Sequence, residues 1–483
     1  MNWLRERFPG VAVYLDPRMA LLGALGFSSG LPLLLVFTTL TVWLTEAGVD
    51  RTTIGIFAAV STPYSFKFVW APLIDLLRVP FLGRALGRRR SWMLLTQLGL
   101  IGAIAALGFT RPDEAPQWTA VAAVAVAFLS ASQDIVIDAY RVDLLEQDEQ
   151  AAGAAVAVFG YRLGMFVAGA GALFAAGWVG RTGALLRPAA IRDAVFALPG
   201  FEPAQLPRLL EVVASEAWRA TYVALAAAML VGVAATMLAR EPDAQRDTTQ
   251  IASAPEGRRG IWRASFFDSV FARVAIWPLV RTFGDFFDRY GRAIGGILTL
   301  VLLFKLADAL AATLRNPFLI ELGYSKEEIA AIAQTYGMVA SIAGSFIGGA
   351  LVKRMGISAS LVWASVLMLV SNLAFAVLAE QGASVWGLTA VITVENLTGG
   401  FGTTTLVAWL SGLCNRDYSA TQYAVLSSLS SVGRTVISTS SGWVATELGW
   451  TGFFVYTALA GLPALALLWH MRRYGWGTPR TAS

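Results

Sequence analysis

The sequence predicts an all-α membrane protein with twelve transmembrane helices arranged as two parallel six-helix repeats. Three observations predict this fold: an apolar composition, apolar stretches of spanning length, and matching residues in the two halves of the chain. Of 483 residues, 56% are hydrophobic and 14% are charged, against about 45 to 50% and about 25% in soluble domains. The mean hydropathy is +0.61. This composition excludes a soluble globular protein.

Apolar stretches long enough to cross a bilayer, which takes about 20 residues each, occur six times before a long polar segment and six times after it. Helices are expected, because the sequence lacks the short alternating segments of a membrane barrel. The expected spans are 18–43, 53–76, 92–110, 118–141, 152–176, 217–238, 293–316, 328–352, 357–379, 385–412, 419–446 and 450–470.

Arginine and lysine are concentrated in the loops of one side. If the N-terminus is cytoplasmic, that side carries Arg84, the run Arg88–Arg90, most of the central loop, and Lys353 with Arg354. The positive-inside rule therefore predicts that both termini are cytoplasmic. The net charge of +5 is explained by these loops, so no nucleic-acid partner is expected. The first apolar stretch is too long for a signal peptide and is expected to stay as a helix.

Matching residues recur in the two halves at nearly the same offset along the chain. The matches are Glu46-Ala-Gly48 with Glu321-Leu-Gly323, Gln150 with Gln422, and Arg162 with Arg434. One six-helix unit has therefore been duplicated in the same orientation, which is typical of transporters whose substrate site lies between the halves at mid-depth.

Three units are expected: an N-terminal bundle at 1–240, a cytoplasmic linker at 241–291 and a C-terminal bundle at 292–483. The linker interleaves aromatic residues with arginines from Trp262 to Arg281, which favours a helix lying in the membrane interface. A plain linker is the alternative. An outer insertion at 187–216 is expected to contain a similar short helix. With one cysteine and one histidine, neither a disulfide nor a metal site is expected, and no cofactor is predicted.

Ionisable residues inside the expected spans are the candidate site residues, because a charge in the bilayer is costly and usually faces a cavity or a partner. Asp134 and Asp138 share one face of the fourth helix, where a carboxylate can carry a proton. Static ion pairs of Asp134 with Arg162 and of Asp138 with Arg141 are equally open. The full set is Lys67, Asp134, Asp138, Arg162, Lys305, Asp308, Glu395 and Arg434.

Lys305 and Asp308 are three residues apart, which favours a structural pair over a substrate contact. The cations Lys67, Arg162 and Arg434 predict an anionic substrate, with mutual neutralisation as the alternative. Aromatic and amide side chains are candidates for sugar contacts, although packing is more frequent for aromatic residues. These are Tyr64, Trp70, Tyr161, Gln133 and Asn396.

Three expected gating features lie on or between the helices. Gly30 and Pro32 in the first span, the prolines of the second, and Gly399-Gly400 in the tenth are expected to break or thin their helices. Glycines of the fifth and eighth spans, such as Gly164 and Gly344, are expected to serve close packing instead. Asp75 and the arginines Arg88 and Arg89 resemble the loop signature of the major facilitator superfamily, which implies a cytoplasmic latch between the halves.

Several longer motifs are similar to those of the AmpG muropeptide permeases within that superfamily. They are Gly26-Phe-Ser-Ser-Gly30-Leu-Pro32, Phe66-Lys67-Phe-Val-Trp70-Ala-Pro72-Leu-Ile-Asp75, Ser130-Ala-Ser-Gln133-Asp134-Ile-Val-Ile-Asp138, Gly160-Tyr-Arg162-Leu-Gly164, Glu395-Asn396-Leu-Thr-Gly-Gly400, Cys414-Asn415 and Ser419-Ala-Thr-Gln422. The resemblance covers nearly all twelve spans.

This resemblance implies a multi-pass permease of the bacterial inner membrane that imports GlcNAc-1,6-anhydroMurNAc and its peptides by proton symport. It further implies a role in peptidoglycan recycling and β-lactamase induction. Its expected partners are a glycopeptide and the lipid bilayer, and a monomer is expected to suffice. The open alternatives are a carrier of another anionic solute, such as an acetyl-CoA-like compound or a siderophore, a membrane enzyme acting on wall precursors, and a sensor that binds without transporting.

Overall fold

The computed structural model describes residues 13–50, 53–54, 57–183, 206–242, 277–291, 293–325, 328–438 and 440–473. Within these ranges the regular structure is entirely helical, which confirms the all-α prediction. Most of the 187–216 insertion and of the linker, including the aromatic stretch before Trp277, lie outside the described residues. The end of the linker forms α17 (Trp277–Tyr290).

The helices of the N-terminal half are short around the second expected span and long elsewhere. They are η1 (Val13–Leu15), α3 (Pro17–Leu34), η2 (Leu35–Thr39), α4 (Leu40–Glu46), η3 (Phe57–Ser61), α6 (Thr62–Phe66), η4 (Lys67–Val69), α7 (Ala71–Leu76), α8 (Leu82–Leu86), α9 (Arg88–Gly108), α10 (Pro116–Leu144), α11 (Gln150–Phe166), η5 (Val167–Gly171), α12 (Ala172–Gly183), α14 (Leu206–Ala228) and α15 (Leu230–Leu238).

The helices of the C-terminal half follow α17 and are mostly long. They are α18 (Ala293–Leu303), α19 (Leu306–Glu321), η8 (Ile329–Tyr336), α21 (Gly337–Met355), α22 (Ile357–Gln381), α23 (Val385–Leu413), η9 (Arg416–Tyr418), α24 (Ser419–Ser438), α25 (Ser441–Leu459) and α26 (Leu462–Arg473).

Nine helices in the described ranges are long and apolar enough to cross a membrane. Three expected spans are not among them. The stretch 53–76 is divided into short helices, and α23 and α24 carry many Thr, Ser and Gly residues. Gly449, with φ 64°, interrupts α25 within the expected connection between 446 and 450. The count of twelve therefore stays a prediction.

The expected helix breaks are confirmed in one place and wrong in two. The second span is broken at η4, between α6 and α7, each of which has a proline in its first turn. In contrast, α3 continues through Pro32 to Leu34 and then forms a π-helical turn. The helix α23 runs unbroken through Gly400. The neighbouring helices explain this difference, because they hold Gly30 on α3 and Gly400 on α23 in tight contact.

Glycines bring two helix pairs into backbone contact. A Cβ at Gly30 would lie 2.0 Å from the carbonyl oxygen of Tyr161 on α11, and one at Gly164 would lie 2.2 Å from that of Phe27 on α3. A Cβ at Gly400 would lie 2.1 Å from the carbonyl oxygen of Ser341 on α21. Small residues permit such close helix crossings in membranes. The packing role expected for Gly164 is therefore confirmed, and the other two share it.

The repeat is visible in matching contacts at the end of each first span. Glu46 at the end of α4 accepts a hydrogen bond from the indole N–H of Trp218 on α14, at 2.8 Å. The matching Glu321 at the end of α19 accepts one from Trp450 on α25, at 2.9 Å. Both halves therefore fasten the end of one helix to a later helix of the same half by a carboxylate and a tryptophan.

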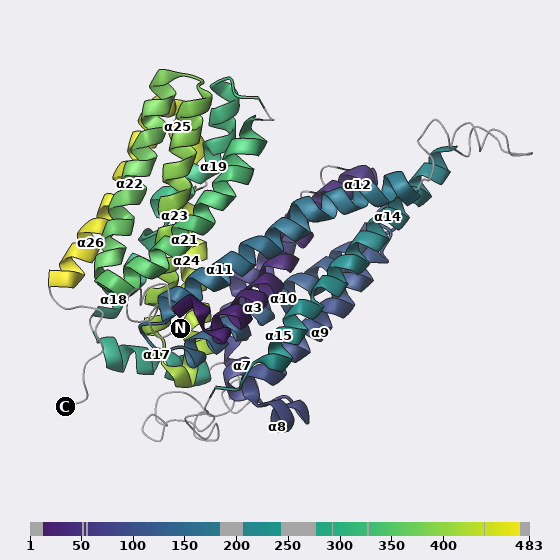
Figure 1. Cartoon of the computed structure of the whole chain (residues 1–483), viewed down its shortest axis with the longest axis horizontal. Coiled ribbons are helices and arrows are strands. Elements are labelled where there is room, and N and C mark those ends of the chain that lie inside the picture. Colours follow the sequence, from purple (N-terminus) through teal and green to yellow (C-terminus); the bar gives the residue numbers. More distant parts are fainter. Residues whose placement is uncertain are drawn as a thin grey trace, which may run out of the picture.

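The two halves lie close together at one end and diverge toward the other (Figure 1). The close end holds Arg89, Arg141, Lys353 and Arg416, and we call it the basic end; the opposite end is the open end. Two apolar core clusters near the basic end include residues of both halves: Val142 joins the C-terminal cluster, and Ala420 joins the N-terminal one. The other two large clusters draw on a single half each.

Candidate functional site

The carboxylate of Asp75 joins the halves at the basic end. Its Oδ2 accepts hydrogen bonds from the backbone N–H and the hydroxyl of Thr421, at 2.8 and 2.7 Å. Its Oδ1 accepts one from the N–H of Ala420, at 3.3 Å. These groups belong to the first turn of α24, where free N–H groups and the helix dipole favour an anion. An acid of the N-terminal half thus caps a helix of the C-terminal half.

Arg89 completes this latch. Its Nη2 donates to Asp75 at 2.9 Å and to the hydroxyl of Ser419 on α24 at 2.8 Å, and its Nε donates to Asp143 at 2.8 Å. The side chains of Arg89 and Asp75 are each only 2% exposed. Arg88 donates to the backbone carbonyl of Asp75. The residues expected to form a latch are therefore together, and Asp143 is a member that the sequence reasoning missed.

Arg141 makes a second contact across the basic end. It donates to the hydroxyl of Ser411 on α23 at 2.8 Å and to Asp138 at 3.2 Å. Of the two alternatives for Asp138, the ion pair with Arg141 is therefore present. On the other flank, the Tyr14 hydroxyl donates to the carbonyl of Phe346 on α21. The exposed pair of Lys353 with Asp148 also crosses between the halves.

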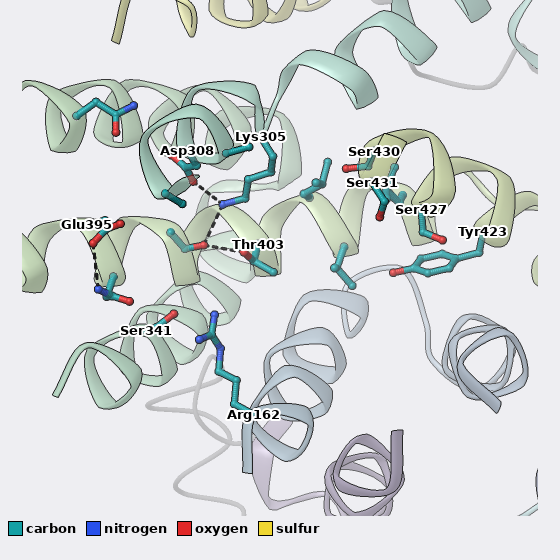
Figure 2. A pocket seen from close by; sticks show the side chains of 18 residues that line it. Arg162, Lys305, Asp308, Ser341, Glu395, Thr403, Tyr423, Ser427, Ser430 and Ser431 are labelled. Atoms are coloured by element: carbon teal, nitrogen blue, oxygen red, sulfur yellow. Dashed lines mark hydrogen bonds and ion pairs between the residues drawn. The ribbon is translucent and has the colours of Figure 1, made fainter. Parts of the chain in front are cut away.

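A cavity of about 430 Å³ lies between the halves (Figure 2). Arg162 on α11 is its lining residue from the N-terminal half, and α19, α21, α22, α23 and α24 supply most of the remaining wall. Five predicted site residues line it: Arg162, Lys305, Asp308, Glu395 and Asn396. Hydroxyl and amide groups that the sequence reasoning did not select complete its polar wall: Ser341, Asn372, Thr403, Tyr423, Ser427, Ser430 and Ser431.

The charges of the C-terminal wall are paired with one another. Lys305 contacts Asp308 at 2.9 Å and also donates to the carbonyl of Gly399. This confirms the pair predicted from their spacing. Glu395 is bound by Arg315 on α19, whose Nη1 lies 3.1 and 3.2 Å from its two carboxylate oxygens. Arg315 lies inside the expected span 293–316. The criterion that selects ionisable residues inside spans could therefore have included it as a candidate.

Arg162 differs from these residues. Within the described part of the chain, it takes part in none of the ion pairs, whereas Lys305 and Arg315 each contact a carboxylate. The pair of Arg162 with Asp134 that the sequence left open is therefore not formed. Arg434 lies on α24, but its side chain lies outside the described residues. Whether Arg434 binds substrate thus stays a prediction.

Asp134 belongs to a separate cluster in the N-terminal half. Its Oδ1 accepts a short hydrogen bond from the hydroxyl of Ser29 on α3. Lys67, from the broken second span, lies near enough for its positive charge to interact with Asp134. Tyr64, from the same span, is also near Asp134. None of these residues lines the cavity described above. The predicted carboxylates Asp134 and Glu395 therefore lie in different environments.

Three further predicted contacts, Gln133, Trp70 and Tyr161, are not among the residues that line this cavity. Gln133 is fully buried and interacts with Ser28 on α3. The indole N–H of Trp70 donates to the hydroxyl of Ser132 at 3.0 Å. Tyr161 precedes Arg162, and its carbonyl is the group that Gly30 approaches. Direct roles of these residues in substrate binding stay predictions.

The sequence matches the Major Facilitator Superfamily over residues 20–436 and 297–482. The chain belongs to this superfamily. It is 37% identical over 458 residues to the anhydromuropeptide permease of Escherichia coli (strain K12), with 94% of this chain and 80% of the relative covered. It is 33% identical over 461 residues to the putative transporter AmpG 4 of Rickettsia felis, with 95% and 98% covered.

Solved structures of the superfamily have the same fold. The structure of the transporter FucP in the outward conformation aligns with a TM-score of 0.65 at 14% identity, covering 95% of this chain and 99% of that one. The proton:xylose symporter XylE aligns with a TM-score of 0.60 at 12% identity, covering 95% of each. The predicted major facilitator fold is confirmed. The protein is a multi-pass transporter of the bacterial inner membrane, not an enzyme, as the sequence predicted.

Proposed function

We propose that this protein imports anhydromuropeptides, GlcNAc-1,6-anhydroMurNAc with or without its peptide, from the periplasm for peptidoglycan recycling. The 37% identity to the anhydromuropeptide permease of Escherichia coli over 94% of the chain carries this proposal. Any part in β-lactamase induction would follow from the same import. We further propose that the protein works as a monomer with no cofactor, since the cavity lies within one chain.

The cavity supports this substrate by its chemistry. A sugar with acetamido groups needs many hydrogen-bonding partners, and hydroxyl and amide side chains line the C-terminal wall. Thr403 on α23 and Ser427 on α24 belong to this wall (Figure 2). A cavity of about 430 Å³ is within the ordinary range for small-molecule sites. A longer peptide would extend toward the open end, where the halves diverge.

We propose that a proton drives import and that Asp134 carries it, with Glu395 as the alternative. Protonating Glu395 would leave Arg315 as an unpaired cation, which is costly away from water. Asp134 is bound by the neutral Ser29 hydroxyl instead. The charge of Lys67 acts on it without a described ion pair, so Asp134 can gain a proton without breaking one.

The transport test uses purified full-length protein in liposomes, with labelled GlcNAc-anhydroMurNAc-tripeptide outside. With an inward proton gradient we expect uphill accumulation that an uncoupler abolishes. Asp134→Asn should lose uphill accumulation but retain exchange of substrate across the membrane without a gradient. Glu395→Gln should keep accumulating. Uphill accumulation by Asp134→Asn would show that another group carries the proton. Binding without uptake would favour a sensor, and no interaction would point to another solute.

A further inference from the structure

Among the described side chains, which do not include Arg434, the C-terminal wall of the cavity has no net charge left to offer a substrate. Lys305 is paired with Asp308 and Arg315 with Glu395, each within the C-terminal half. Two cations and two carboxylates therefore balance. The polar groups beside them, such as Thr403 and Ser427, are neutral. This wall therefore suits the hydroxyl and amide groups of a ligand better than the charged groups of that ligand.

Arg162 brings an unbalanced positive charge to this cavity from the opposite half. Figure 2 shows its side chain extending from α11 toward the C-terminal wall, below the Lys305–Asp308 pair. Its Nε is buried without a partner, and no described carboxylate pairs with the guanidinium. Arg162 is partly buried, and a cation held partly away from water without a counter-ion is unfavourable. In a membrane protein this residue type in this setting marks a place for an anion.

Local packing fixes the direction of this side chain. Gly160 and Gly164, on either side of Arg162 on α11, are both in backbone contact with α3: a Cβ at Gly160 would lie 1.9 Å from the carbonyl of Gly23, and one at Gly164 would lie 2.2 Å from that of Phe27. Because these contacts fix the rotation of α11, Arg162 projects away from the glycine seam. The guanidinium is therefore placed before the ligand arrives.

We infer that Arg162 is the anchor for the substrate's carboxylate, and that the neutral C-terminal wall binds its sugar hydroxyl and acetamido groups. This inference rests on the proposed function. A guanidinium binds a carboxylate through two parallel hydrogen bonds, which a lysine cannot reproduce. In the disaccharide without peptide, the carboxylate is that of the lactyl group. A bound substrate then connects α11 of one half to α23 and α24 of the other.

The test compares two ligands that differ in one charge: GlcNAc-anhydroMurNAc with its free lactyl carboxylate, and the same disaccharide with that group converted to the primary amide. Affinities are measured by calorimetry on the full-length protein in detergent. The wild type should bind the acid about 10- to 100-fold more tightly than the amide, as expected for a charge-assisted contact. In Arg162→Gln the ratio should fall to about 1, with the affinity for the amide little changed.

Two further variants control this experiment. Arg162→Lys keeps the charge but not the paired geometry, so its ratio should be intermediate. Arg111→Gln removes the same charge from an exposed arginine that pairs with Glu114, so it should keep the wild-type ratio. Equal binding of acid and amide by the wild type would overturn the inference while leaving the proposed function standing. So would an equal loss of both ligands in Arg162→Gln. If the wild type binds neither ligand, the proposed function itself fails.

Discussion

Charged residues are paired differently at the basic end and in the cavity. At the basic end, Asp75 and Arg89 of one half are bound to backbone and hydroxyl groups at the start of α24 in the other half. In the cavity, the charges of the C-terminal half pair within that half, and Arg162 faces them without a partner. The charges of the first contact are paired without a ligand, whereas among the described residues the second lacks an anion.

This difference indicates which part of the molecule a substrate can change. A latch whose charges are already paired holds the basic end closed when the cavity is empty. Bringing the open ends together around Arg162 would desolvate a lone cation against a neutral wall, which is unfavourable. A bound carboxylate removes that cost. The substrate therefore favours closure at the open end, and the latch must then break for release.

The largest expected effect comes from breaking the latch. Asp75→Asn keeps the shape of the side chain but removes the anion that Arg89 and the α24 N-terminus share. Loss of one partner of a buried pair costs about 3 to 5 kcal/mol, so the equilibrium should shift toward an open basic end by about 100-fold or more. The single cysteine, Cys414, follows α23 at this end and reports the change as faster labelling by a maleimide.

The matched control for this measurement is Asp148→Asn, which removes an exposed carboxylate that also pairs across the halves. Its labelling rate should rise by no more than about fivefold, the limit for losing an exposed pair. An unchanged rate in Asp75→Asn would show that the latch contributes little to closing the basic end, and the contrast with the cavity would disappear.

A smaller effect is expected when the cavity wall is disturbed without changing any charge. Gly400→Ala places a Cβ against the Ser341 carbonyl of α21, whereas Gly399→Ala on the same helix meets nothing within 4 Å. Overpacking costs about 1 to 3 kcal/mol, so Gly400→Ala should lower the midpoint of thermal unfolding while Gly399→Ala should not. Equal midpoints would mean that α21 and α23 can separate freely, which the close crossing argues against.

A still smaller effect is expected from the exposed pair at the basic end. Lys353→Gln removes the partner of Asp148, whose side chain is 68% exposed. Such pairs contribute about 0 to 1 kcal/mol, so Cys414 labelling should rise by no more than about fivefold. A rise comparable to that of Asp75→Asn would show that the exposed Lys353–Asp148 pair holds the basic end closed as strongly as the buried Asp75–Arg89 pair.

The smallest effect is expected from Arg162 in the empty protein. Because no described carboxylate pairs with it, Arg162→Gln breaks no ion pair. It only removes the cation that disfavours closing the open end, and the latch still holds the basic end, so Cys414 labelling should rise by no more than about twofold. A large change without ligand would reveal a structural role and would contradict the contrast drawn between the two regions.

Sequence reasoning placed Asp75 and Arg89 in a latch because their segment resembles the loop signature of the major facilitator superfamily. It predicted Lys305 and Asp308 as a pair because three residues separate them on one chain segment. It missed Arg315 as the partner of Glu395, since 80 residues separate them. It also predicted substrate contacts for Gln133 and Trp70, which interact with Ser28 and Ser132 of their own half; those substrate contacts stay predictions.

The sequence by itself determined the membrane class, most of the helical spans, the duplication and the set of buried charges, because hydropathy and spacing are properties of the chain alone. The tertiary structure decided which charges are paired. That outcome depends on the rotation of each helix about its axis, which contacts such as Gly160 and Gly164 against α3 fix. Asp138 thereby meets Arg141, Glu395 meets Arg315, and Arg162 alone is left facing the cavity among the described charges of its wall.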